Sequence, residues 1–362
     1  MTYPKQGGLP ALVVVLIFVA VAACQQPASN ARQPVGGVTL LGDKGHPTKV
    51  FQLSSDGRAA VGYIFDGNKP DNSPGGGLNH FHSFYWTETG GLQLIKTATG
   101  ADVEVRAISA NGLVAVGRFY VGYQSHVFHW TQASGLEDLG APDGHQFFGC
   151  GACSATATAV SADGSVIYGR LINHSSFRWT RATGIRDLHI RGEIVSSSAD
   201  GLTAMGVRFV GDGPDRPFLW TAAKGFRDLG VPPGTFNDDY GLGVEPAAMS
   251  SDGSTIAGEF AVAKGDMRGF RWTRDHGYQT LPGGETASVR AVSADGSQIA
   301  GAVLDPGRRV HPVRWIGASP PKPIGIPGVA VLFATAISGD GRVIAGATKL
   351  DGETHAFLAR LD

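Results

Sequence analysis

The sequence has no excess of charge of either sign, few cysteines, and only one short apolar run near its start. Its 30 Lys and Arg nearly balance its 31 Asp and Glu, so it lacks the charge footprint of a protein that binds nucleic acid or an anionic membrane surface. The apolar run at residues 9–23 has 15 residues, which is short for a membrane span. The remaining composition, 42% apolar with 53 Gly, is typical of a globular, turn-rich chain.

The chain also lacks the short motifs of several enzyme classes. It contains no Gly-x-Ser-x-Gly elbow, no His-Glu-x-x-His helix, no P-loop and no dinucleotide fingerprint. Its repeated Ser-x-Asp turn is similar to the Asp box of sialidases, but the Gly-x-Thr-Trp that completes that motif is missing. None of these activities is therefore indicated.

Residues 1–24 are predicted to be a targeting segment. Lys5 precedes the apolar run, as in a signal peptide. The run ends in Val-Ala-Ala-Cys24, which resembles the lipobox of bacterial lipoproteins. That resemblance implies a lipid anchor on Cys24, and the alternative is an ordinary signal peptide with an incidental cysteine.

The lipobox resemblance also gives a location in the bacterial cell envelope. Gln25 is not the Asp that retains many such lipoproteins in the inner membrane, so the resemblance implies the outer membrane, facing the periplasm or the outside. Residues 25–36 are polar with Pro and Gly, and we expect them to form a flexible tether.

A repeat fills the rest of the chain and decides the fold. Seven times, Ser stands two residues before Asp or Asn, with Gly directly after the Asp or Asn and again six residues after it. Asp-Gly between β-branched runs predicts a β-hairpin, in which the Ser hydroxyl and the carboxylate lock the turn. The Asp/Asn positions are Asp56, Asn111, Asp163, Asp200, Asp252, Asp295 and Asp340.

An aromatic strand follows each hairpin. All six Trp of the chain occupy one position in it, with Phe or Val two residues before, so that both side chains point to the same face. A turn of constant length then leads to a fourth strand with an aliphatic residue nine positions after the Trp. The repeat therefore predicts four-stranded blades, about 47 residues apart, as in a β-propeller.

The last repeat ends before its fourth strand, and residues 37–42 carry the Leu-Gly close of a fourth strand with nothing before it. We therefore predict that residues 37–362 form an all-β, seven-bladed propeller. Its ring is closed by the N-terminal strand 37–42, which completes the last blade and removes the open sheet edges.

The aromatic segment resembles the HAF repeats of bacterial extracellular proteins. His355-Ala-Phe357 spells the signature, and the Ser-Ala-Asp-Gly and Asp-Leu-Gly segments recur in order at fixed spacing over about nine-tenths of the chain. The pattern departs at Ser175, Arg216, Arg268 and Ala359. The resemblance implies a repeat architecture outside the cytoplasm and no established activity.

Function is expected on one face of the disc, because the connections between second and third strands and between blades vary in length while the hairpin turns do not. The longest such loop, residues 66–80, offers Asp66, Asn68 and Asp71. These oxygen ligands suit Ca²⁺ weakly, since their spacing is not that of an EF-hand, and the alternative is a solvated loop. We expect no other cofactor and no resident metal.

Two further loops contain candidate side chains. Cys150 and Cys153 are expected to form a disulfide outside the cytoplasm, with free thiols or a redox or metal site as alternatives. A zinc site with His145 lacks a fourth ligand. The loop at 230–246 offers Asp238, Asp239, Tyr240 and Glu245, which suit a glycosidase or contact with a sugar and are otherwise solvated.

A basic column precedes the aromatic strand in most repeats. We expect its members to make hydrogen bonds or cation–π contacts between neighbouring blades, and the alternative is a ring that faces an acidic ligand. The column consists of His82, His126, Arg216, Arg268, His311 and His355.

Regular blades without a catalytic motif favour a non-catalytic, monomeric propeller on a lipid anchor, binding a protein or polysaccharide through its variable loops. The alternative is a hydrolase or lyase acting on envelope glycans or lactones. That reading requires Asp143, His145, Asp238 and Asp239 to meet near the centre of the ring.

Overall fold

The computed structural model describes residues 32–35, 37–42, 46–65, 81–122, 124–140, 155–172, 174–211, 215–236, 243–263, 266–326, 330–350 and 352–361. Throughout these ranges the chain forms strands and turns and no helix, so the expected all-β class is confirmed. Correspondingly, no helix in the described ranges has the length and apolar character needed to cross a membrane.

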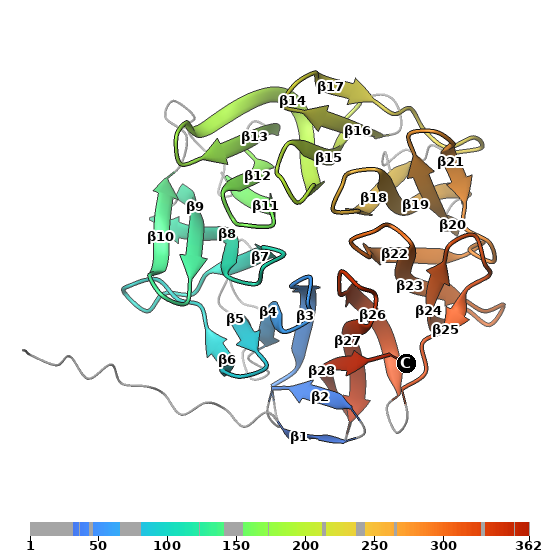
Figure 1. The fold of residues 1–362 in the computed structure, drawn as a ribbon, viewed down its shortest axis with the longest axis horizontal. Helices are drawn as coiled ribbons and strands as arrows, with labels where there is room; N and C mark the ends of the chain where they lie inside the picture. The colour runs from blue at the N-terminus through green and yellow to red at the C-terminus, as the bar shows by residue number, and fades with distance from the viewer. Residues whose placement is uncertain are drawn as a thin grey trace, which may run out of the picture.

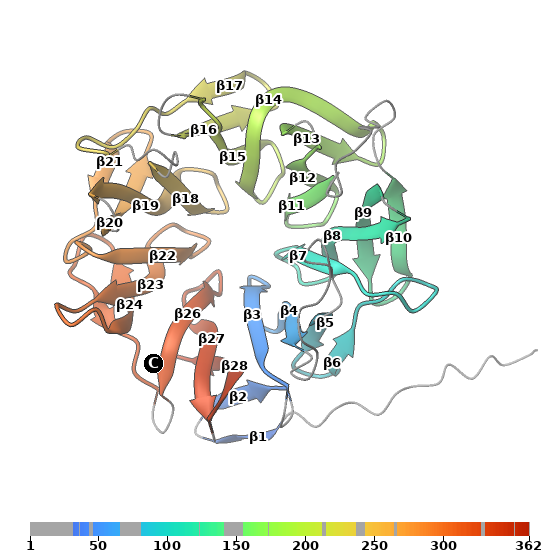
Figure 2. The ribbon, with the colours of Figure 1, turned by 180° about the vertical axis from the view of Figure 1, so that it is seen from behind.

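The strands form antiparallel sheets arranged around a common centre, with the first strand of each four-stranded unit innermost (Figures 1 and 2). The first sheet consists of β3 (Thr48–Leu53), β4 (Ala59–Phe65), β5 (Phe81–Thr87) and β6 (Gly91–Leu94). The second consists of β7 (Glu104–Ile108), β8 (Val114–Val121), β9 (Gln124–Thr131) and β10 (Gly135–Gly140). Next comes a seven-stranded sheet of β11 (Thr156–Val160), β12 (Val166–Arg170), β13 (Ser175–Thr180), β14 (Gly184–Ser197), β15 (Thr203–Arg208), β16 (Arg216–Thr221), β17 (Gly225–Asp228). Its long strand β14 pairs with β13 through its first half and with β15 through its second half, so it serves two successive units.

Three more sheets follow. One consists of β18 (Val244–Met249), β19 (Thr255–Ala263), β20 (Asp266–Thr273) and β21 (Gly277–Thr280). The next consists of β22 (Ala287–Val292), β23 (Gln298–Leu304), β24 (Val310–Ile316) and β25 (Lys322–Pro323). The last combines β26 (Val331–Ile337), β27 (Val343–Leu350) and β28 (Glu353–Arg360) with β2 (Val38–Leu41) and β1 (Arg32–Val35). In this last sheet the first and last strands of the described chain lie side by side, the first in blue and the last in red (Figure 1).

Strand β2 pairs antiparallel with β28, and Leu40 lies opposite Phe357. Residues 32–35, which we expected to belong to the flexible tether, form β1 and pair with β2. Strand pairing in the described residues therefore begins before residue 37.

The repeated turn is held as its residue types predict. In each copy the Ser Oγ donates to the Asp or Asn Oδ1 and accepts the N–H of the residue five positions on; for Ser198 these distances are 2.6 Å to Asp200 and 3.0 Å from Thr203. Asp200 also accepts the N–H of Leu202 at 2.9 Å. The hydroxyl and N–H bonds lower the pKa of Asp200 below its usual value.

Successive turns are also joined to one another by backbone hydrogen bonds. In six of the seven copies the residue between Ser and Asp donates to its counterpart in the next copy, as Ala199 does to Ser251 at 2.7 Å. In the second copy Asn111 itself donates, to the carbonyl oxygen of Ala162. The last of these bonds runs from the N–H of Gly339 to the carbonyl oxygen of Ser55, also at 2.7 Å. The turns thus form a hydrogen-bonded collar on one face of the molecule.

The core lies between neighbouring sheets. The Phe residues of the aromatic strands, such as Phe84 and Phe218, are fully buried. The Trp two residues on packs against the preceding sheet, as Trp130 does on Tyr85 with ring centroids 4.9 Å apart. The Trp315 indole N–H likewise donates to the carbonyl oxygen of Pro282 at 2.9 Å. These aromatic contacts therefore bury apolar area between units as well as within them.

Candidate functional site

Every innermost strand contains a β-bulge, and the bulge turns one side chain out of the regular pairing. The register shift falls at the residue three positions before the repeated Ser. Bulges commonly re-aim a side chain next to functional sites. The seven bulge residues are Phe51, Arg106, Thr158, Val195, Ala247, Arg290 and Thr335.

The second Gly of the repeat makes room for this bulge. A Cβ built on Gly301 would lie 2.1 Å from the carbonyl oxygen of Ser288, and one on Gly62 would lie 2.0 Å from that of Lys49. No side chain fits at such a distance, so the glycine lets the inner strand approach its neighbour. The repeat motif thereby sets the position of the inward side chain, whose identity differs from unit to unit.

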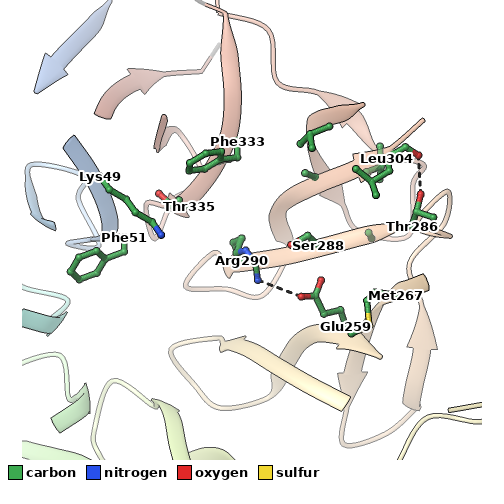
Figure 3. Close-up of a pocket in the computed structure, with 15 residues that line it drawn as sticks. Lys49, Phe51, Glu259, Met267, Thr286, Ser288, Arg290, Leu304, Phe333 and Thr335 are labelled. Carbon is green, nitrogen blue, oxygen red and sulfur yellow. Dashed lines mark hydrogen bonds and ion pairs between the residues drawn. The ribbon is translucent and has the colours of Figure 1, made fainter. Parts of the chain in front are cut away.

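A cavity of about 630 Å³ lies among the inner strands β3, β22 and β26, next to β19 and β23 (Figure 3). Met267, Leu304 and Val310, at the ends of strands that flank the loops between second and third strands, form part of its wall. The cavity therefore opens on the face that carries the variable loops, where we expected function.

Glu259 is the buried acid of the cavity. Its side chain is 7% exposed, its Oε1 lies 3.4 Å from a guanidinium nitrogen of Arg290, and its Oε2 accepts the N–H of Val289 at 3.1 Å. Burial raises the pKa of Glu259; Arg290 opposes this shift, and Glu245, directly opposite in the β18–β19 register, adds to it. A carboxyl group with a raised pKa is suited to accept and return a proton near neutral pH.

Two cations face the cavity. Arg290 is half exposed although it pairs with Glu259. Lys49 on β3 is exposed, extends toward Thr335 (Figure 3), and forms no ion pair with any residue that the structure describes. An unpaired ammonium group beside a cavity is available to an anionic ligand.

The remaining walls combine rings and hydroxyl groups. Phe51 and Phe333 line the cavity on the side of β3 and β26. Thr335 Oγ1 donates to the carbonyl oxygen of Val50 at 2.7 Å, which ties β26 to β3. Largely apolar walls with a few charged groups are typical of small-ligand sites. This arrangement suits a sugar ring that carries a carboxylate.

Most of the side chains singled out from the sequence lie outside the described residues. These are Cys24, Asp66, Asn68, Asp71, Asp143, His145, Cys150, Cys153, Asp238, Asp239 and Tyr240. Their roles in lipidation, a disulfide, calcium binding or catalysis stay predictions. Glu245 is described, exposed, and placed opposite Glu259 on the neighbouring strand.

The residues of the basic column lie near the start of the third strand of their units, and most of them pair with carboxylates. His126 lies 2.8 Å from Asp138, and Arg216 lies 3.2 Å from Asp228, each within its own four-stranded unit rather than between neighbours. His82, His311 and His355 likewise lie 2.7, 3.0 and 3.6 Å from Asp102, Asp305 and Glu353. Arg268 is exposed on β20. These residues do not line the cavity.

No group of three or more His, Cys, Asp or Glu within the described ranges is placed to hold a metal ion. Among the described residues, the carboxylates around the cavity are Glu259 and its neighbour Glu245, and Glu259 already forms an ion pair with Arg290. This donor set does not fit a metal.

Comparisons with known proteins identify the fold. No protein-family model and no curated protein sequence matches the chain, so the HAF resemblance stays a prediction. Among solved structures, oligogalacturonate lyase from Vibrio parahaemolyticus matches with a TM-score of 0.58 and 12% identity over 90% of this chain and 93% of that one. Oligogalacturonate lyase in complex with manganese matches with a TM-score of 0.56 and 11% identity, over 92% and 96%. The β-propeller domain of Cps50 (Swd1) from Myceliophteria thermophila matches with a TM-score of 0.51 and 12% identity, over 90% and 99%.

These likenesses confirm the β-propeller architecture of antiparallel, mostly four-stranded sheets. They correct the expectation of a non-catalytic binding scaffold. The similar structures include an enzyme, oligogalacturonate lyase, that matches almost end to end, and this accords better with the alternative of a glycan lyase. Because the identities are low, the likeness itself concerns the fold.

Sequence analysis did not single out Lys49, Glu259 or Arg290. They belong to three different units and meet only in the folded ring. A signal was nonetheless present. The positions three and five before each repeated Ser vary between charged, aromatic, hydroxyl and small apolar residues in an otherwise constant segment, and Arg290 and Lys49 occupy two of them.

Proposed function

We propose that this chain is a lyase that cleaves an acidic oligosaccharide by β-elimination in the cavity between β3, β22 and β26. One observation carries the proposal: the cavity sets the cations Lys49 and Arg290 against the buried carboxyl group of Glu259. The likeness of the fold to oligogalacturonate lyase supports it.

The chemistry follows from a sugar that carries a carboxylate. The hydrogen on the carbon next to a carboxylate is acidified when cations neutralise that group, because negative charge develops there as the proton leaves. Lys49 and Arg290 provide this stabilisation. Arg290 presents a planar fork of donors that suits a carboxylate, and Lys49 adds a point charge.

Glu259 takes the proton. Its carboxylate forms the new O–H bond as the C–H bond breaks, and the electron pair of that bond forms a carbon–carbon double bond. The C–O bond to the neighbouring sugar breaks, and the leaving oxygen receives the proton back from Glu259. One carboxyl group can perform both transfers when hydrogen and leaving group lie on one side of the ring. No water is consumed.

The test uses the purified full chain with uronate oligosaccharides, and it monitors the ultraviolet absorbance of the conjugated unsaturated acid that elimination produces. We expect Glu259→Gln to lower kcat by roughly 10²–10⁴-fold, the usual contribution of a positioned proton-transfer group. Glu88→Gln is the matched control, because Glu88 is exposed beside the repeated turns and pairs with Arg58. Equal activity of both variants would remove Glu259 from the mechanism.

We also propose that the sheets make up seven blades and that β2 closes the ring. Support comes from the pairing of β2 with β28 and from the hydrogen bond that joins Gly339 to Ser55. Because β14 serves two successive units, the sheets divide into as many units as there are repeated turns. Deletion of residues 37–42 should then abolish cooperative unfolding, whereas a variant that unfolds as the intact chain does would contradict closure.

We propose that this lyase is anchored through a lipid on Cys24 to the outer membrane of the bacterial cell envelope, where the tether holds it near polymeric substrate. The resemblance of Val-Ala-Ala-Cys24 to a lipobox supports this location. Cys24→Ala should release the protein from the membrane fraction. Retention of the variant in that fraction would contradict the anchor.

A further inference from the structure

We propose that the substrate continues from the cavity across Phe51 to a second acidic subsite, at which Arg106 of β7 binds the carboxylate of another sugar unit. This inference rests on the proposed lyase function and extends it. It defines the substrate as an acidic oligosaccharide of at least three sugar units, in which two carboxylates are bound by two separate guanidinium groups.

Phe51 connects the two subsites. Its half-buried ring lines the cavity and also packs against the core between β3 and β7, which includes Val105 and Phe119. The Tyr63 ring supports it, with centroids 4.9 Å apart. A rigidly held, partly exposed ring beside charged groups presents an apolar face to the C–H face of a sugar.

Hydrogen bonds fix β7 relative to β3. The Tyr63 hydroxyl donates to the carbonyl oxygen of Val105 at 2.8 Å, and the Gln52 side-chain carbonyl accepts the N–H of Ile108 at 2.7 Å. Arg106 follows Val105 directly, so its backbone is held beside the Phe51 ring. The second subsite is therefore built on rigid strands rather than on a loop.

The charges around Arg106 do not cancel. Glu104 is buried, and both Arg106 and Arg118 pair with it, the latter at 2.5 Å between Nε and Oε2. Two guanidinium groups on one carboxylate leave one positive charge. Arg118 is 21% exposed and lies over the Tyr120 ring, whereas Arg106 is 45% exposed, so Arg106 is the cation that solvent and ligand reach.

Arg106 also occupies a position of defined geometry. It is the bulge residue of β7, as Arg290 is the bulge residue of β22, and no other bulge residue of the inner strands is basic. Arg118 by itself neutralises the Glu104 carboxylate, so Arg106 is not needed for that ion pair. The second arginine at an inward bulge therefore points to a ligand carboxylate, which a guanidinium group binds through two parallel hydrogen bonds.

The test compares oligogalacturonates of increasing length, starting at the dimer, with their methyl esters, which lack the charge. Binding is measured by calorimetry in the Glu259→Gln background, and cleavage is measured separately with the unaltered catalytic residues. We expect Arg106→Gln to weaken binding of the trimer and longer acids on the order of tenfold and to leave the dimer nearly unchanged. Arg106→Lys keeps the charge without the fork and should lie between. Phe51→Ala should weaken binding at every length, because the Phe51 ring also lines the cavity.

Arg170→Gln is the matched control, because Arg170 is a partly exposed arginine of the neighbouring unit that lies 4.0 Å from Glu193. Thermal denaturation of each variant shows whether it is folded. If Arg106→Gln weakened binding equally at every chain length, or not at all, the second subsite would be overturned while the lyase stands. Failure of the unaltered chain to cleave any acidic oligosaccharide would instead overturn the proposed function, and the binding series would still decide on Arg106.

Discussion

The N–H of Gly339 donates a hydrogen bond of 2.7 Å to the carbonyl oxygen of Ser55, although the two residues lie near opposite ends of the chain. It belongs to the collar of bonds between successive repeated turns. Through it, the last turn of the chain meets the first.

Gly339→Val should destabilise the protein at this junction. A Cβ at Gly339 would lie 2.0 Å from Ser55 Oγ and 3.1 Å from the Ser55 carbonyl oxygen, so the larger side chain must push the turns apart. Overpacking of this kind costs about 1–3 kcal/mol, measured as a lower free energy of unfolding in urea. Gly325→Ala is the control, because nothing lies within 4 Å of a Cβ there. Equal stability of the two variants would mean that the junction yields without cost.

The aspartates of the repeated turns should make stability depend on acid pH. Their pKa values are lowered in the folded protein; for Asp200, the hydrogen bond from the Ser198 hydroxyl is the main cause. Their contribution is thus present above the unfolded pKa and lost as pH falls through the folded one, below about pH 4. Asn111 makes the same turn with the same hydrogen bonds and does not titrate. Replacing the six aspartates by Asn should therefore flatten the dependence of Tm on pH in the acid range; an unchanged slope would assign acid unfolding to other groups.

The acid limb of the pH–rate profile should report Glu259. Elimination needs its carboxylate, so activity falls as pH drops through a pKa that burial and Glu245 hold above the usual value. Glu245→Gln removes one of the raising influences, and the limb should move to lower pH with little change in the plateau rate. A limb that stays in place in this variant would show that another group titrates.

Lys49→Met should reduce discrimination between acidic and neutral substrates. The unpaired ammonium group is expected to bind the carboxylate of the sugar in the cavity, so its loss should lower kcat/KM for the free acid about tenfold or more and leave the methyl ester unaffected. Lys322→Met is the matched control, since Lys322 is exposed on the short outer strand β25. A parallel loss on both substrates would indicate a structural role for Lys49.

The parts of this structure that could be predicted from sequence are those with local causes. Ser198 and Asp200 are two residues apart and lock their own turn, and Phe and Trp two apart share a strand face, so hairpins and blades were predictable. The role of Gly301 was not, because it depends on the carbonyl oxygen of Ser288 on another strand. The cavity was missed for the same reason, since Lys49 and Glu259 approach one another only through the curvature of the whole ring.

The most direct test of the central claim is mass spectrometry of the products formed from an acidic oligosaccharide. Cleavage by elimination gives a fragment with a carbon–carbon double bond, lighter by one water than the corresponding product of hydrolysis. We predict this lighter fragment with the unaltered chain and its loss in Glu259→Gln. Intact substrate alone, or products that have gained water, would contradict the account.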